Sequence, residues 1–244
     1  MEELLIIGAG ATGRELANII FDINDNKPTW NLIGFLDDDP AKLGQTLHGI
    51  PVLGPIASAS QYSARIAISI AVLKHRSLRH DIIAGLRLIP EQLATIIHPS
   101  SIISRFASVG PGTIVMSNTV INTDTVIGKS VIIQYHCSIS HDVVIEDFVT
   151  IAPSATICGY VQLQEGAYVG AGSVITNGTA SRRRLIGAGA LIGLGAVVIR
   201  DVPPGMTAVG NPARLVLPAV ESKFDPLASD DAQIRGQAAA NREL

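Results

Sequence analysis

TVINTDTVIGKSVIIQYHCSISHDVVI, residues 119–145, is the part of the chain that decides the fold. Within it, isoleucine stands at every sixth position, from Ile121 to Ile145. The register continues on both sides, so that every sixth residue from Ile97 to Ile175 is isoleucine, valine or leucine. A period of six fits neither an α-helix nor an ordinary strand. Repetition at a fixed period indicates a solenoid.

A second register runs in phase with the first, because a small or β-branched residue stands two positions before each large one, as Thr119 and Cys137 do. One large and one small residue per hexad is typical of a parallel β-helix. Three hexads make one triangular coil, so residues eighteen apart should stack about 4.8 Å from one another.

The register breaks between residues 176 and 185 and resumes at Ile186, Ile192 and Val198. We interpret the break as an external loop. The sequence DVPPG, residues 201–205, is expected to end the last coil, and the polar segment 218–244 is expected to be a tail.

The first ninety residues have a different pattern, typical of a small parallel α/β unit. Strands are expected at 4–7, 32–36 and 66–72, with helices after the glycine-rich segment 8–13 and near 77–86. Glycine and proline between 49 and 55 are read as loop markers. We therefore expect an α/β domain over 1–94, a β-helix over 95–217 and a tail over 218–244.

The composition of the 244-residue chain narrows the class of protein. A net charge of -3 argues against nucleic acid as a partner. No apolar stretch approaches the roughly 20 residues of a membrane span, and no leader is evident. Two cysteines, Cys137 and Cys158, suit a reducing compartment, so we expect a cytoplasmic protein without a disulfide between them.

The segment GAGATG, with glycines at Gly8, Gly10 and Gly13, follows a strand and precedes a helix. Backbone N–H groups at such a turn favour a phosphate. Asp37, Asp38 or Asp39 could take the ribose contact of a nucleotide. The solenoid begins after about three strands, so this half-Rossmann unit holds one nucleotide at most. A purely structural tight turn is the alternative.

His141 stands two residues after the inward Ile139, where a corner of the coil should turn its imidazole outward. A histidine is suited to act as a general base near neutral pH. One coil later the equivalent residue is Gly159, which should leave open space and a free N–H beside the ring. His136 is the competing candidate. Asp142 can orient the imidazole only if the corner bends, because neighbours on a strand point to opposite faces.

The remaining chemistry-bearing residues give weaker signals. His136, Cys137, His141 and Cys158 do not follow a usual zinc spacing, so no metal is expected. Arg182, Arg183 and Arg184 lie on the loop that interrupts the coil. They form either a solvated face or a contact for the phosphates of an acyl carrier such as coenzyme A.

With the hexads, His141, Gly159 and the segment GNPAR at 210–214 in place, residues 3–217 resemble the left-handed β-helix sugar O-/N-acyltransferases of the sialic acid O-acetyltransferase type. LLIIGAGATGRELANII, GFLDDD, IIHPS and SISHDVVIEDFVTIAP carry the resemblance. That family includes bacterial enzymes that N-acetylate nucleotide-linked 4-amino sugars. The resemblance implies a homotrimer, acetyl-coenzyme A in the groove between adjacent solenoids, and a nucleotide-sugar on the α/β domain near the same groove.

The resemblance also implies roles for individual residues. His141 becomes the base that takes a proton from the acceptor, Asp142 its acidic partner, and Gly159 a backbone contact to acetyl-coenzyme A. Acetyl-coenzyme A contacts are also expected at Gln134, Thr150 and Arg183, although some relatives have asparagine at the first of these positions and histidine at the second. The nucleotide-sugar is expected at Gly8, Gly10, Gly13, Asp37 and Asp38.

The function expected from this resemblance is acetyl-coenzyme A-dependent N-acetylation of a nucleotide-linked amino sugar, such as a 4-amino-4,6-dideoxy sugar of polysaccharide biosynthesis. Direct attack needs no covalent enzyme intermediate. O-acetylation of a sialic acid or a related sugar is the first alternative. A non-catalytic β-helix binding protein and an NAD-dependent oxidoreductase are the others.

Overall fold

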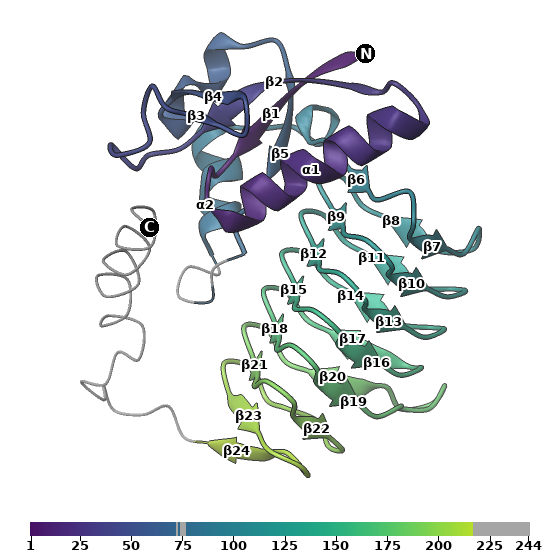
Figure 1. Cartoon of the computed structure of the whole chain (residues 1–244). Helices are drawn as coiled ribbons and strands as arrows, with labels where there is room; N and C mark the ends of the chain where they lie inside the picture. Colours follow the sequence, from purple (N-terminus) through teal and green to yellow (C-terminus); the bar gives the residue numbers. More distant parts are fainter. Residues whose placement is uncertain (72, 74–76, 217–244) are drawn as a thin grey trace, which may run out of the picture.

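The structure is a computed structural model, and it describes residues 1–71, 73 and 77–216. Figure 1 shows an α/β unit that covers one end of a long solenoid, with the coils stacked away from it. The polar tail expected over 218–244 lies outside the described residues.

The α/β unit is built on a sheet of order β3-β4-β2-β1-β5. The strands β1, β2, β4 and β5 run parallel. The bounds are β1 (Glu2–Ile7), β2 (Trp30–Leu36), β3 (Thr46–Leu47), β4 (Ile50–Gly54) and β5 (Arg65–Ile68). The strands predicted at 4–7 and 32–36 are confirmed, whereas the one predicted at 66–72 already ends at Ile68.

The strand β4 corrects the expectation of loops between residues 49 and 55. Ile50 and Val52 are buried, which gives the alternation of a half-buried strand over a very short stretch. Proline and glycine at Pro51 and Gly54 hide that alternation in the sequence.

Helices also belong to the unit, and those with described bounds are α1 (Ala11–Asn26), α2 (Leu78–Leu86), and the short 3-10 helices η1 (Ile56–Gln61) and η3 (Pro90–Gln92). Helix α1 buries Leu16 and Ile20, four residues apart on one face. They belong to an apolar cluster that also contains Ile114 and Met116 of the solenoid. The α/β unit is therefore packed onto the solenoid through its own core.

The solenoid has three faces, here called faces I, II and III. Face I holds β6 (Ile96–Ile97), β9 (Ile114–Val115), β12 (Ile132–Ile133), β15 (Thr150–Ile151), β18 (Tyr168–Val169), β21 (Leu191–Ile192), β23 (Thr207–Val209) and β24 (Arg214–Val216). Face II holds β7 (Ile102–Ile103), β10 (Val120–Ile121), β13 (Ser138–Ile139), β16 (Thr156–Ile157), β19 (Val174–Ile175) and β22 (Val197–Val198). Face III holds β8 (Ser108–Val109), β11 (Val126–Ile127), β14 (Val144–Ile145), β17 (Val161–Leu163) and β20 (Arg184–Ile186).

The coil length of eighteen residues is confirmed by the pairing, because Ile121 lies beside Ile139 and Ile139 beside Ile157. The large residues point inward, and all three are at most 1% exposed. Burial of such a side chain contributes about 1.5 to 3 kcal/mol. Repetition of this contribution in every hexad fixes the register.

The small inward positions hold polar side chains without leaving them unpaired. The buried hydroxyls of Thr113, Thr119 and Thr125 donate hydrogen bonds of 2.8 to 3.0 Å to carbonyls fifteen residues later. Cys137 occupies the same register, and burial raises the pKa of its thiol to about 11. Its side chain packs into the core, as the sequence predicted.

The corners of the coil have their own period of six. A residue in the left-handed region, with φ between 51° and 61°, stands at each corner from Asn118 to Tyr160. Its members are Asn118, Asp124, Ser130, His136, Asp142, Phe148, Ser154 and Tyr160. Glycines take over this position at Gly166 and Gly172. The left-handed conformation turns the chain from one face to the next.

The predicted external loop is confirmed between β19 and β20. Leu163 pairs with Ile186, twenty-three residues later instead of eighteen, so five extra residues leave the coil. The predicted end of the solenoid at residues 201–205 is wrong. Gly205, with φ of 68°, is another corner, after which β23 pairs with β21 and β24 folds back antiparallel. No helix in the described part of the chain is long and apolar enough to cross a membrane.

Candidate active site

His141 follows β13 at the corner between faces II and III. Its side chain is 51% exposed, so the imidazole points outward, as predicted. His136, the competing histidine, lies at the corner between faces I and II and has its ring 6.3 Å from that of Tyr135. The two histidines therefore serve different corners of the solenoid.

Asp142 reaches His141 because the corner bends the chain. Its φ of 56° is left-handed, and its N–H donates to the carbonyl of Thr123 over 3.1 Å. Oδ2 of Asp142 then lies 2.8 Å from Nδ1 of His141. A carboxylate in this position favours a proton on Nδ1. The other nitrogen, Nε2, is left as the outward-facing proton acceptor.

Gly159 lies directly beneath the imidazole, one coil along the solenoid. A Cβ on Gly159 would stand 2.7 Å from Cε1 of His141, so any side chain there would have to displace the imidazole. The open space expected here is thus filled by the histidine ring itself. The ring of Tyr160 meets the imidazole edge to face at 5.3 Å. Among the described residues, the N–H of Gly159 has no hydrogen-bond acceptor.

The loop between β19 and β20 brings cations to this corner. Nη1 of Arg183 donates to the backbone carbonyl of Asp142. Arg184 and Arg182 instead approach Asp201, at 3.0 and 3.6 Å. A cavity of about 520 Å³ beside the loop is lined by Asn177, Gly178, Thr179, Arg182, Arg183, Arg184, Arg200 and Asp201. Arg183 is the arginine that connects this basic cavity to the His141 corner.

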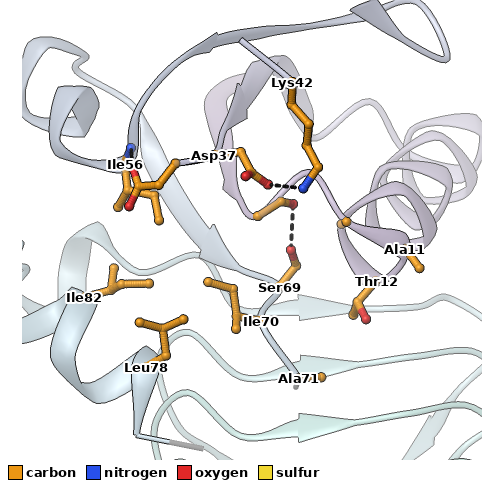
Figure 2. Close-up of a pocket in the computed structure, with 14 residues that line it drawn as sticks. Ala11, Thr12, Asp37, Lys42, Ile56, Ser69, Ile70, Ala71, Leu78 and Ile82 are labelled. Atoms are coloured by element: carbon orange, nitrogen blue, oxygen red, sulfur yellow. Dashed lines mark hydrogen bonds and ion pairs between the residues drawn. The ribbon is translucent and has the colours of Figure 1, made fainter. Parts of the chain in front are cut away.

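A second cavity, of about 440 Å³, opens at the carboxyl ends of β1, β2 and β5 (Figure 2). The predicted substrate residues all line it, namely Gly8, Gly10, Gly13, Asp37 and Asp38. Gly8 has φ of 98°, and a Cβ on Gly13 would stand 1.9 Å from the carbonyl oxygen of Gly8. Glycine is therefore required at both positions by the backbone.

A carboxylate already faces the glycine loop in this cavity. Oδ2 of Asp37 accepts the N–H of Ala9 at 2.7 Å and lies 3.1 Å from Nζ of Lys42 (Figure 2). Burial acts to raise the pKa of Asp37, but hydrogen bonds from the N–H groups of Asp39 and Ala9 and the nearby Lys42 lower it below its ordinary value. Lys42 is not among the residues predicted from the sequence, where its only signal is its place five residues after Asp37.

Asp38 has a different role in the wall of the cavity, because its Oδ1 accepts the N–H of Ile56 at 2.8 Å. The first N–H groups of α1 have no partner within the helix, as at any helix N-terminus. Ala11 and Thr12, at that end, line the cavity. The end of α1 that favours an anion therefore faces this cavity.

The structure does not bring two predicted residues to His141. Thr150 belongs to β15 of face I and Gln134 directly follows β12 of the same face, whereas His141 lies at the corner opposite that face. Thr150 is buried, and its Oγ1 accepts a hydrogen bond of 2.9 Å from Arg79. The described residues contain no group of three or more histidine, cysteine or acidic side chains that could hold a metal ion.

Comparisons with known proteins agree with this arrangement. The family described as the PglD N-terminal domain matches residues 3–82. GDP-perosamine N-acetyltransferase of Escherichia coli O157:H7 is 35% identical over 210 residues, which cover 86% of this chain and 94% of that protein.

Two solved structures have the same architecture. The acetyltransferase domain of PglB from Neisseria gonorrhoeae, in complex with acetyl coenzyme A, is 28% identical with a TM-score of 0.77, and the match covers 88% of this chain and 99% of that one. PerB from Caulobacter crescentus, in complex with CoA and GDP-perosamine, is 27% identical with a TM-score of 0.73, over 89% of this chain and 98% of that one.

The fold and the site therefore define an acyltransferase enzyme built as an α/β unit followed by a left-handed parallel β-helix. The chain belongs to the family of hexapeptide-repeat sugar acetyltransferases that carry a PglD N-terminal domain and include GDP-perosamine N-acetyltransferase.

Proposed function

We propose that the protein transfers the acetyl group of acetyl-coenzyme A to the amino group of a nucleotide-linked amino sugar, such as a 4-amino-4,6-dideoxy sugar. The observation that carries the proposal is the His141–Asp142 pair held over Gly159. The relatives named above support it, because one is a GDP-perosamine N-acetyltransferase and another was solved with CoA and GDP-perosamine.

In the proposed reaction the amine nitrogen attacks the thioester carbonyl, and Nε2 of His141 takes the proton from nitrogen. The N–H of Gly159 is placed to donate to the oxygen that becomes negative, where a fixed donor stabilises the transition state. The tetrahedral intermediate collapses to the amide, and the coenzyme A thiolate leaves and takes up the proton. Asp142 keeps His141 oriented and stabilises its charged form.

Acetyl-coenzyme A is proposed to lie along the His141 corner, with the basic cavity near its phosphates. Arg183 is the residue we assign to that contact, because it adjoins both the cavity and the backbone of Asp142. Arginine forms paired hydrogen bonds with phosphate oxygens. Gln134 stays a candidate contact only from a neighbouring solenoid, since it directly follows β12 of face I, away from the His141 corner of its own chain.

The nucleotide is proposed to bind in the cavity of the α/β unit. Gly8, Gly10 and Gly13 let the chain approach its phosphates, and the N-terminus of α1 favours their charge. Asp37 and Asp38 are assigned to the base or ribose side. Asp37 holds the ammonium group of Lys42 in the same cavity, so a nucleotide bound there would have a cation near its phosphates.

The positions of the two sites support a homotrimer. The α/β unit packs against face I, whereas His141 lies at the corner opposite that face. A sugar held by one α/β unit is therefore directed to the His141 of a neighbouring protomer. Three large apolar side chains on the outer surface of the solenoid, Ile102, Phe106 and Val126, are 66%, 69% and 51% exposed. They suit burial between solenoids.

The proposed domain boundaries stay at 1–94 and 95–217, with a tail over 218–244. We also propose a cytoplasmic location, where acetyl-coenzyme A is available and thiols stay reduced. The two cysteines are consistent with it, since Cys137 and Cys158 are both free.

The experiment that tests the function measures coenzyme A release with a panel of acceptors. The panel contains GDP- and UDP-linked 4-amino sugars, the same nucleotide sugars with a hydroxyl in place of the amine, and free sialic acids. We expect turnover only with the nucleotide-linked amines, and a product that resists hydroxylamine because it is an amide. Turnover with sialic acid and a hydroxylamine-labile product would establish O-acetylation instead.

A further inference from the structure

Arg79 is a buried charge at the junction between the α/β unit and the solenoid. It lies on α2, and only 2% of its surface is exposed. Every nitrogen of the guanidinium donates a hydrogen bond. Nε donates to the carbonyl of Ser130 at 3.1 Å and Nη1 to that of Ile70 at 2.7 Å. Nη2 donates to the carbonyls of Phe148 and Val149 and to Oγ1 of Thr150.

These acceptors are all uncharged, and no carboxylate of the described residues pairs with Arg79. Burial lowers the pKa of the guanidinium to about 10, so the group still carries its charge at neutral pH. A buried charge held by uncharged carbonyl and hydroxyl groups is costly compared with an apolar side chain of the same size. Its presence here needs a reason other than stability.

The acceptors identify what Arg79 connects. Ser130 and Phe148 are corner residues of two successive coils, eighteen positions apart. Ile70 lies just beyond β5 and lines the nucleotide cavity. One side chain therefore ties the end of β5 to two coils of the solenoid.

Helix α2 completes this connection from the other side. Its residues Leu78 and Ile82 line the same cavity as Ile70 (Figure 2). Arg79 stands between them in the sequence and reaches the solenoid instead. The wall of the cavity formed by α2 and Ile70 is thus attached to the β-helix by the Arg79 guanidinium, beside an edge-to-face contact of His80 with Phe148 at 5.4 Å.

We infer that Arg79 is a positioning residue, which holds the acceptor-sugar cavity at a fixed place relative to the solenoid. The inference rests on the proposed function, in which the cavity presents an amine to a histidine on a different corner of a solenoid. Acyl transfer needs the reacting atoms aligned, and an error of about 1 Å can cost about 100-fold in rate. Rigid attachment of the cavity is a reason to retain the buried charge.

Guanidinium is suited to this role because its planar group offers five donors in fixed directions. Lysine has three donors on one atom and cannot reach Ser130, Ile70 and Phe148 together. Methionine fills a similar volume without any donor and leaves the carbonyls unpaired. Arg79→Lys should therefore keep part of the hydrogen bonding between α2 and the solenoid, and Arg79→Met should lose all of it.

The test compares these variants with Arg87→Met. Arg87 is an exposed arginine immediately after α2, and no side-chain hydrogen bond of its own is found among the described residues. For Arg79→Met we expect the KM of the nucleotide-linked amino sugar to rise about tenfold and kcat to fall up to about 100-fold. The KM of acetyl-coenzyme A should stay within about twofold, because that substrate binds at the other corner.

Calorimetric titration with GDP, UDP and acetyl-coenzyme A provides the second readout. Weaker nucleotide binding with unchanged acetyl-coenzyme A binding, an intermediate effect in Arg79→Lys and no effect in Arg87→Met support the inference. Partial unfolding alone would reduce the active fraction and leave both KM values unchanged.

Wild-type KM values in both Arg79 variants would overturn the positioning role and leave the proposed function standing. A wild-type protein that binds neither nucleotide and turns over no nucleotide sugar would overturn the proposed function, and the inference with it.

Discussion

The imidazole of His141 rests against the backbone of Gly159, one coil further along the solenoid. A Cβ on Gly159 would lie 2.7 Å from Cε1 and 2.8 Å from Nε2 of the histidine. The carboxylate of Asp142 holds Nδ1 from the other side at 2.8 Å. The imidazole is thus held between the backbone of Gly159 on one side and the carboxylate of Asp142 on the other.

Gly159→Ala should therefore reduce activity without unfolding the solenoid. The new methyl group has to displace the imidazole, and we expect kcat to fall about 10- to 100-fold. Urea unfolding should show little change, because Gly159 has no left-handed φ that alanine would strain. Gly85→Ala is the matched control, since a Cβ there meets nothing within 4 Å. Normal turnover in Gly159→Ala would show that the position of the ring is unimportant.

His141→Ala should lower turnover by about 10²- to 10⁴-fold, the loss typical of a missing general base. Binding of acetyl-coenzyme A and of the nucleotide, measured by calorimetry, should persist. His136→Asn is the control, because asparagine accepts the left-handed conformation that His136 adopts, with φ of 60°. If His136→Asn is inactive and His141→Ala is not, the assignment of the base is reversed.

Asp142→Asn removes one charge at nearly constant shape, and asparagine tolerates the φ of 56° at this corner. A hydrogen bond to a charged group contributes about 1.5 to 3 kcal/mol, so we expect kcat to fall about 10- to 100-fold. The KM values should change little, because Asp142 is not assigned to a substrate. Steady-state kinetics with both substrates measure kcat and the two KM values. A raised KM with an unchanged kcat would show that Asp142 takes part in substrate binding instead.

The Asp37 carboxylate makes a prediction about pH. Its pKa is lowered in the folded protein, because the N–H groups of Asp39 and Ala9 and the cation of Lys42 outweigh the opposing effect of burial. A lowered pKa in the fold means that the carboxylate stabilises the protein above the unfolded value near 3.9, and that this contribution is lost as pH falls through the folded value.

Asp37→Asn should therefore be less stable than wild type at pH 7, and the difference should shrink below about pH 4. Urea midpoints between pH 3 and pH 7 measure it. Asp25→Asn, on the exposed end of α1, is the control and should show no such difference. A stability difference between wild type and Asp37→Asn that grows as the pH falls would mean that the folded protein favours the protonated form of Asp37.

The sequence predicts the solenoid well because its signal is repeated. A single hexad carries little information, but every coil adds the same inward isoleucine or valine, and the pairing of Ile121 with Ile139 follows directly. The eighteen-residue length of one coil also predicts that Gly159 lies beside His141. By contrast, β4 has only Ile50 and Val52 to signal it, and Pro51 suggests a loop.

Details of the site depend on backbone geometry that no residue pattern displayed. Asp142 reaches His141 only because the corner residue is left-handed. Arg79 gave one overlooked signal, since it occupies the apolar stripe of α2 with Ile82, Ile83 and Leu86, where a charge is unusual. Its acceptors, the carbonyls of Ser130 and Phe148, lie fifty or more residues away and carry no side-chain signature.

The offset of twenty-three residues between Leu163 and Ile186 shows how this chain tolerates changes in its length. An insertion at a corner leaves the inward columns above and below it in register. Loss of one residue within a hexad would instead turn every following isoleucine toward the solvent. Natural and engineered variants that differ in length are thus expected to differ at corners, which makes the corners the positions where a foreign peptide can be grafted.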